Sequence, residues 1–281
     1  MNSITQQFCE NAYKLMSTYT ILPIRCGDIV NHARSCFLYR KDCGGAHLNA
    51  PCIAWLLRSD AHTVIVDAGP GSRARAPQCY TESDAGHDDL LQYGLAKAGV
   101  EPDAIELVIL THLHHDHVGG ARLFRNARFH VQEAELKEAV WPVPFQRPIY
   151  GTNQRGKTPP WIDVLDRMIV ADGDENVLPG IRVLKLPGHT AGSQGVLVDT
   201  DDGPYLIAGD LIPLYENWPA HGGEPVPNGN HTDLRAYDDS FRRIAALGAK
   251  VLPAHDPRVF ECASYPPGAI PRRQPRNEGA N

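Results

Sequence analysis

Long apolar runs are missing from this chain of 281 residues. No stretch approaches the roughly 20 consecutive apolar residues that a helix needs to cross a bilayer, so a membrane partner is not expected. Residues 1–17 also lack a basic segment followed by an apolar one, which predicts no signal peptide. We therefore expect a cytoplasmic protein.

Basic surface is equally scarce. The formal net charge is −6, and the only concentration of basic residues is the tail at Arg272, Arg273 and Arg276. Proteins that bind nucleic acid place cations against its phosphates, so nucleic acid is not an expected partner. A small-molecule substrate is expected instead, and a homodimer is left open.

The CxxC spacing is absent among the seven cysteines, which are Cys9, Cys26, Cys36, Cys43, Cys52, Cys79 and Cys262. An odd number without paired spacing predicts mostly reduced thiols, as in a cytosolic protein. A disulfide among Cys26, Cys36 and Cys43 is left open.

No internal repeat divides the chain, and its composition is that of an ordinary globular protein, with 42% hydrophobic and 21% charged residues. We expect one domain over residues 1–281, with a core from about 18 to 262 and a disordered tail at 264–281. Short β patterns alternate with helical ones along the chain. The expected strands and helices cover 52–57, 62–67, 88–98, 128–132, 133–140 and a helical stripe that begins after Asp233.

The most informative segment runs from Thr111 to Gly120, with the sequence THLHHDHVGG. It follows an apolar stretch, 105–110, that predicts a buried strand. On an extended chain His112 and His114 project to the same side, and a following helical turn would bring Asp116 and His117 to a second position nearby. Imidazole and carboxylate without thiolate suit zinc, manganese or ferrous iron and leave room for water. His115 is out of phase and is expected to face away.

Three further apolar runs end in a metal-ligand type of residue, at His189, Asp210 and His255. Each is preceded by a small residue, Gly188, Gly209 or Ala254, where we expect the backbone to pass close to the metals. A pair of metals needs more than four protein ligands, and these three residues would complete the set.

With these motifs the chain resembles the metallo-β-lactamase superfamily over roughly residues 18–262, which implies an αββα sandwich. The resemblance implies that His112, His114 and His189 hold one ion. Asp116, His117 and His255 would hold the other, and Asp210 would bridge the two. It also implies that Asp67, in the VIVDAG segment, supports a metal-bound histidine; a turn cap before Gly69 is the alternative.

Within the superfamily the chain most resembles the N-acyl homoserine lactonase-like hydrolases. True zinc β-lactamases have a cysteine at the position of Asp210, and the flavodiiron branch has glutamate at that of His114. Glyoxalase II enzymes carry a C-terminal glutathione-binding segment, whereas only 26 Pro-rich residues follow His255. One departure is that lactonases have a tyrosine where this chain has Pro213, with Tyr215 two positions later.

The expected function is a dinuclear metal-dependent hydrolase that opens a lactone with a metal-bridging hydroxide. Asp116 would hold the nucleophile and pass a proton to the leaving alkoxide, and Tyr215 would donate to the developing oxyanion or pack against Trp218. Two divalent ions are required, Zn²⁺ first, with Mn²⁺, Fe²⁺ or Co²⁺ as alternatives. The alternative activities are an arylesterase, a phosphotriesterase or a thioesterase of the same fold, or a non-hydrolytic metal-binding or oxygenase member.

Two Pro- and Gly-rich segments, 141–161 and 212–231, are too irregular for helices or strands. Loops of about twenty residues in a compact domain are commonly functional. We expect the first, with its exposed aromatics, to form a substrate-pocket wall or a subunit contact. The second starts beside the expected metals and predicts another pocket wall.

Overall fold

The computed structural model describes residues 17–152, 156–219 and 223–269. Residues 1–16, where no signal peptide is expected, and the basic tail at Arg272, Arg273 and Arg276 lie outside the described residues, as does Cys9. The six described cysteines are all free, so no disulfide joins Cys26, Cys36 and Cys43. Within the described ranges no helix is long and apolar enough to cross a membrane.

The first sheet has six strands in the order β1-β2-β3-β4-β5-β6. Their bounds are β1 Thr20–Ala33, β2 His47–Arg58, β3 Thr63–Val66, β4 Leu107–Ile109, β5 Arg128–Gln132 and β6 Met168–Ala171. β1, β2 and β3 pair antiparallel, whereas β3 to β6 run parallel. The carboxyl ends of β3 and β4 therefore meet at the same edge, where the THLHHDH segment begins.

The second sheet has five strands in the order β11-β10-β9-β8-β7. They are β7 Glu175–Leu178, β8 Ile181–Lys185, β9 Gln194–Thr200, β10 Gly203–Ile207 and β11 Lys250–Leu252. β8 and β10 are both antiparallel to β9, and β11 is parallel to β10. Strands β8, β10 and β11 therefore run in the same direction. The residues that follow them, His189, Asp210 and His255, therefore come to one edge.

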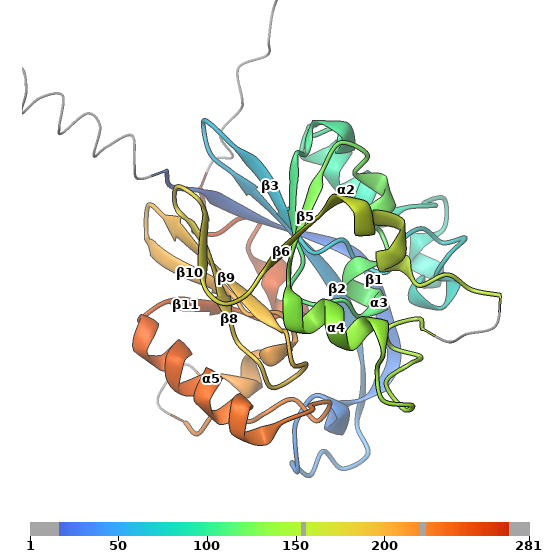
Figure 1. Cartoon of the computed structure of the whole chain (residues 1–281), viewed down its shortest axis with the longest axis vertical. Helices are drawn as coiled ribbons and strands as arrows, with labels where there is room; N and C mark the ends of the chain where they lie inside the picture. The colour runs from blue at the N-terminus through green and yellow to red at the C-terminus, as the bar shows by residue number, and fades with distance from the viewer. Residues whose placement is uncertain (1–16, 153–155, 220–222, 270–281) are drawn as a thin grey trace, which may run out of the picture.

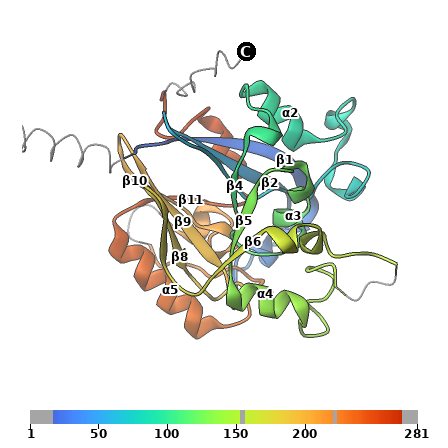
Figure 2. The ribbon, with the colours of Figure 1, turned by 45° about the horizontal axis from the view of Figure 1, so that its top comes forward.

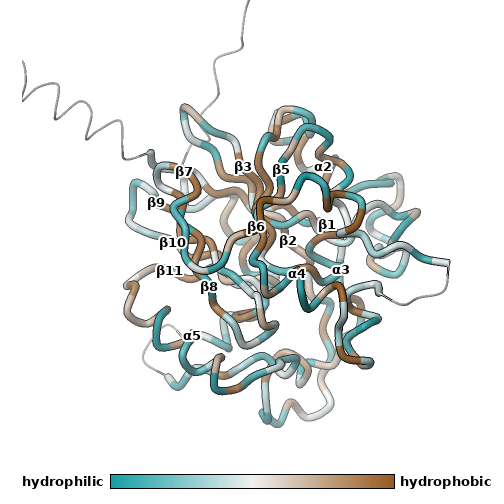
Figure 3. The backbone as a smooth tube through the Cα atoms, viewed as in Figure 1, coloured by the Kyte–Doolittle hydropathy of each residue, from teal (hydrophilic) through white to brown (hydrophobic). Residues whose placement is uncertain are grey.

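Period-2 alternation places three apolar layers in the molecule. Val64 and Val66 of β3 pack with Val183 of β8 in a cluster that joins the two sheets. Ile65, between them in sequence, faces the opposite way, into the cluster beneath the helices of the first sheet. Leu184 likewise turns outward to a third cluster, under the last helix. Figure 3 shows the hydrophobic strands at the centre of the molecule.

Four described α-helices cover the sheets: α2 Leu90–Lys97, α3 His115–Val118, α4 Glu133–Val140 and α5 Leu234–Leu247. Figures 1 and 2 show α5 outside the second sheet and α2, α3 and α4 on the side of the first. The Asp233 carboxylate caps α5 by accepting from the backbone N–H groups of Arg235 and Ala236. The predicted αββα sandwich is confirmed.

Two details differ from expectation. In segment 141–161 Trp141 and Phe145 are exposed, but Tyr150 and Trp161 are buried in the core under the first sheet, because a 3₁₀-helix over Pro160–Arg167 carries Trp161 inward. The disorder predicted for the tail is wrong for residues 264–269, because Tyr265 exchanges two backbone hydrogen bonds of 2.8 Å with Ile21.

Candidate metal centre

The THLHHDH segment leaves β4 in an extended conformation and turns into α3 at His115, as the spacing predicts. His112, His114, Asp116 and His117 are all buried. Two hydrogen bonds fix the extended part: the Gln194 N–H donates to the Thr111 carbonyl at 2.9 Å, and the Leu113 N–H donates to the Glu135 carboxylate at 2.9 Å. The segment thus presents its side chains from a backbone that is held on both sides.

The structure brings His112, His114 and His189 together. The ligand atoms that these three residues offer all lie within 4.8 Å of one another. His114 Nδ1 and His189 Nε2 are 3.1 Å apart, close to the distance of about 3.3 Å between two nitrogens of one tetrahedral zinc. His189 Nδ1 donates to the Asn230 carbonyl at 2.7 Å, so its Nε2 carries the free lone pair.

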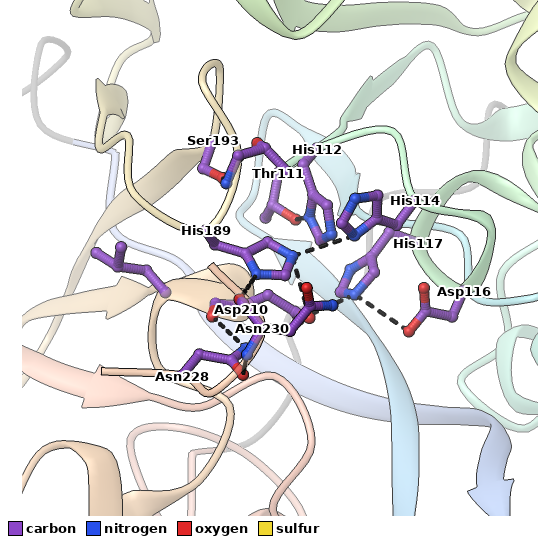
Figure 4. Close-up of polar contacts among 12 residues, drawn as sticks. Thr111, His112, His114, Asp116, His117, His189, Ser193, Asp210, Asn228 and Asn230 are labelled. Carbon is purple, nitrogen blue, oxygen red and sulfur yellow. Dashed lines mark hydrogen bonds and ion pairs between the residues drawn. The ribbon is translucent and has the colours of Figure 1, made fainter. Parts of the chain in front are cut away.

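A second group forms beside the first, from Asp116, His117, Asp210 and His255. Figure 4 labels Asp116, His117 and Asp210 of this group. The Asp116 Oδ2 lies 3.7 Å from the Nε2 atoms of both His117 and His255. The Asp210 Oδ1 lies 3.0 Å from His117 Nε2 and 2.9 Å from His255 Nε2, and its Oδ2 lies 3.5 Å from His189 Nε2. Asp210 therefore stands between the two groups, with one oxygen toward each.

Several of these atoms are buried without a hydrogen-bond partner. Those on the ring edges and carboxylate that face the cluster are the Nε2 atoms of His112, His117 and His255 and the Oδ1 of Asp210. Burying a polar atom unpaired costs free energy, so such atoms in a native protein call for an explanation. Divalent cations on this nitrogen and oxygen donor set would satisfy them, and the set is of the kind that zinc, manganese and ferrous iron accept. The residues present fit a metal centre.

Asp67 supports the second group from beneath. Its backbone has φ = +60°, an uncommon conformation for a non-glycine residue. Its carboxylate accepts from the Thr111 N–H at 2.7 Å, the Thr111 hydroxyl at 2.8 Å and His117 Nδ1 at 2.8 Å. Because Nδ1 carries a proton in that contact, Nε2, which faces Asp210, is the nitrogen left to bind a metal. Of the two alternatives for Asp67, this geometry favours support of a histidine.

Burial dominates the electrostatics of the first group. It lowers the pKa of His112 and of His114 well below the usual value, and the neighbouring imidazoles lower it further. Burial also lowers the pKa of His189, against the attraction of Asp210. These imidazoles are neutral at pH 7, which is the form that binds a metal.

Charge attraction dominates the second group. Burial raises the pKa of Asp116, but the imidazoles of His117, His115 and His255 outweigh it and hold the pKa at about 2. Burial likewise opposes ionisation of Asp210, and His255 and His117 hold its pKa well below the usual range. Burial lowers the pKa of His117, whereas the surrounding carboxylates raise it well above the ordinary value. Asp116 and Asp210 are therefore ionised at neutral pH, and two buried negative charges favour the binding of cations at this position.

Sequence reasoning missed Glu135. This residue of α4 is fully buried. Its Oε1 accepts from the Leu113 N–H and, at 3.0 Å, from the Tyr150 hydroxyl, and its Oε2 accepts from the Thr190 hydroxyl at 2.5 Å. It thereby ties the His112–His114 segment to the turn that carries His189. The signal was its helical spacing to Ala139 on the buried face of α4.

Cys52 was counted only as a reduced thiol. It lies on β2 with its side chain fully buried. Its Sγ, a carboxylate oxygen of Asp116 and a ring nitrogen of His255 all lie within 4.8 Å of one another. Burial, and then the charge of Asp116, raises the pKa of this thiol well above the usual value. No spacing along the chain connects residues 52, 116 and 255.

The structure does not bring Tyr215 to this cluster. Its ring lies 5.0 Å from the Arg258 guanidinium. It packs with the cluster between the sheets, whereas Trp218 packs on Phe241 of α5 at 5.5 Å. Neither the oxyanion role nor the packing of Tyr215 on Trp218 finds support in this arrangement.

The remaining predicted features are placed as follows. The His115 side chain is partly exposed and lines a surface pocket with Pro148, Gly151 and Lys157 of segment 141–161. None of the ligand-type residues lines this pocket, so a substrate-pocket wall in this segment stays a prediction. In segment 212–231, the carbonyl of Pro213 accepts from the His255 N–H at 2.9 Å. The Asn228 amide in the same segment donates to the carbonyl of Asp210 at 3.0 Å. This segment positions the ligand-type residues; Gly222 lies outside the described residues.

Comparison with known proteins agrees with this geometry. The sequence profile described as the metallo-beta-lactamase superfamily matches residues 50–255. An N-acyl homoserine lactonase of a Bacillus species is 28% identical over 184 residues, covering 62% of this chain and 69% of the relative. The metallo-beta-lactamase domain-containing protein 1 of Xenopus laevis is 28% identical over 223 residues, covering 78% and 76%.

Solved structures give the same fold. A quorum-quenching N-acyl homoserine lactone lactonase superposes with a TM-score of 0.69 at 23% identity, covering 90% of this chain and 98% of that one. AidC, described as a dizinc quorum-quenching lactonase, superposes with a TM-score of 0.65 at 16% identity, covering 86% and 92%. At these identities the likeness establishes the architecture.

Proposed function

This chain belongs to the metallo-beta-lactamase superfamily, and from that premise we propose that it is a lactone hydrolase with a centre of two divalent cations. The observation that carries the proposal is the position of Asp210 between two groups of buried imidazoles, with one oxygen toward each. His112, His114 and His189 would hold one cation. Asp116, His117 and His255 would hold the other, with Asp210 shared.

When bound, two divalent cations supply Lewis acidity toward a carbonyl oxygen and lower the pKa of water toward neutrality. The chain contributes the acid and base. Asp116, whose carboxylate is ionised at neutral pH, would accept the proton of the attacking water and return it to the leaving alkoxide. In a lactone that alkoxide stays tethered to the acyl group, so a single hydroxy acid is formed.

The choice of a lactone rests on relatives. The N-acyl homoserine lactonases at 27–28% identity are named for this reaction. In our proposal Asp210 of this chain bridges the two cations. The absence of a nearby phenol from Tyr215 leaves polarisation of the carbonyl to the cations. Zn²⁺ is the proposed metal.

A hydrolysis screen of the metal-loaded chain tests the substrate class. Lactones, aryl esters, thioesters and phosphotriesters are compared at equal concentration, with S-lactoylglutathione and RNA as substrates that we expect to be left intact. The proposal expects the highest kcat/KM on a lactone. A preference for an aryl ester, a thioester or a phosphotriester would contradict the lactone as substrate and leave the proposed two-cation centre unaffected.

Asp210→Asn tests the shared carboxylate. Losing this ligand should remove one or both ions and lower kcat/KM at least about a hundredfold, because both cations lose a charged donor. The matched control is Asp202→Asn, which removes an exposed carboxylate paired with Lys250. Normal metal content and turnover in Asp210→Asn would contradict the bridging assignment.

A further inference from the structure

The first strand pair contributes an unassigned group to the second cation position. Cys52 belongs to β2, far in sequence from the other ligand-type residues. Its Sγ, an oxygen of Asp116 and a ring nitrogen of His255 all lie within 4.8 Å of one another. All three side chains are buried, and Cys52 and His255 have no exposed surface.

The His255 ring is aimed at this space. Its Nδ1 donates to the carbonyl of Pro51 at 2.9 Å, so its lone pair is on Nε2. That Nε2 is buried and has no hydrogen-bond partner. Pro51 and Cys52 are consecutive residues of β2. The same part of this strand therefore orients the His255 imidazole and places the Cys52 thiol beside it. An unpaired ring nitrogen beside a carboxylate and a sulfur is the donor arrangement of a metal site.

The other thiol in the same apolar core serves as a contrast. Cys26 is equally buried and belongs to the same cluster, but its Sγ donates to the carbonyl of Ile24 at 3.3 Å. Its partner is ordinary backbone. Cys52 instead has Asp116 and His255 beside it, two residues that the proposed function already assigns to the second cation.

We propose that Cys52 is a thiolate ligand of the second cation, in addition to Asp116, His117 and His255. This inference rests on the proposed metal centre. A thiolate binds zinc or cobalt more favourably than manganese, because soft sulfur donors select borderline-soft ions. The thiol must release its proton when the ion binds, so no oxidant or other reactant is needed. Cys52 would therefore select zinc over manganese at this position.

X-ray absorption at the zinc edge of the full-length, zinc-loaded chain reads the ligand atoms directly. The inference expects a sulfur neighbour at about 2.3 Å in addition to nitrogen and oxygen at about 2.0–2.1 Å. The sulfur signal should persist in Cys26→Ser and vanish in Cys52→Ser. The cobalt-loaded chain should show an intense near-ultraviolet sulfur-to-cobalt charge-transfer band with the same dependence on Cys52.

Metal competition gives a readout of selectivity. In Cys52→Ser the preference for Zn²⁺ over Mn²⁺ should fall by about tenfold or more, since loss of even an outer partner costs about that much affinity. If Cys52→Ser fails to fold, as judged by circular dichroism, the wild-type zinc spectrum decides alone. Two bound ions with only nitrogen and oxygen neighbours would overturn the thiolate ligand and leave the centre intact. Fewer than two ions would overturn the centre and the ligand with it.

Discussion

The ring of Tyr215 faces Arg258 and packs against the cluster between the two sheets, not at the metal centre. Tyr215→Phe should therefore leave kcat on the best lactone within about twofold of wild type, whereas removing a true oxyanion donor costs roughly a hundredfold or more. Steady-state kinetics at saturating substrate decides. A tenfold or greater fall in kcat with unchanged metal content would return this phenol to the reaction.

Glu135 makes stability depend on pH. Burial raises the pKa of its carboxyl from 4.5 to about 7, although the Thr190 hydroxyl and the Leu113 N–H oppose this. A raised folded-state pKa contributes stability that is fully present below pH 4.5 and lost as the pH rises through 7. The change amounts to about 3 kcal/mol.

Glu135→Gln isolates this contribution, because an amide mimics the protonated acid. We expect the unfolding free energy of the metal-free wild type to fall relative to that of the variant by about 3 kcal/mol between pH 4.5 and 7.5. Urea unfolding at several pH values measures it. A constant difference between the two proteins over this range would show that the Glu135 carboxyl titrates normally.

For single residues, the sequence allowed the seven ligand-type residues to be selected, because four follow one apolar run and the other three each end another. It could not show Glu135 or Cys52 as part of the site. Both lie inside regular elements, and only the packing of α4 and β2 against the ligand segments reveals their partners. Tyr215 was selected because it lies two positions after Pro213, where the lactonases have a tyrosine. The turn after β10 does not bring it to the metal centre.

Among the elements, the turns that carry the ligands depend on close approach. The small residues before His189 and Asp210 were expected to let the backbone pass near the metals. The structure gives a different reason. A Cβ on Gly188 would lie 2.7 Å from the Cα of Tyr237 in α5, and a Cβ on Gly209 would lie 2.9 Å from the Cβ of Thr111. These turns are pressed against neighbouring elements.

Gly188→Ala should therefore lower the unfolding free energy by about 1–3 kcal/mol through overpacking, beyond the backbone cost at its φ of +143°. Gly173→Ala is the matched control, since Gly173 also has a positive φ, +111°, but open space around its Cβ position. Thermal unfolding of both variants separates the two costs. Equal destabilisation would show that the contact with α5 is unimportant.

Helices and strands with clear periodicity were predictable. The ranges 128–132 and 133–140 agree with β5 and α4, and the cap at Asp233 is where α5 begins. Segment 141–161 was less predictable, because its proline and glycine content gives no periodic pattern from which the burial of Tyr150 and Trp161 could be inferred. Their positions depend on tertiary contacts with the first sheet and with Glu135.

For the whole molecule, we propose that residues 18–262 form one domain. The groups that converge at the metal centre come from both sheets, so neither sheet could build the site alone. Periodicity predicted strands and helices, but their assembly into an αββα sandwich followed from the family resemblance, since strand order depends on contacts far apart in sequence.

The most direct test of the central claim is the metal content of the full-length chain. The protein is stripped of metal, loaded with Zn²⁺, freed of excess by gel filtration and measured by elemental analysis alongside its protein concentration. The account predicts two ions per chain, since buried donor atoms without hydrogen-bond partners occur in both groups. One ion per chain, or none, would contradict it.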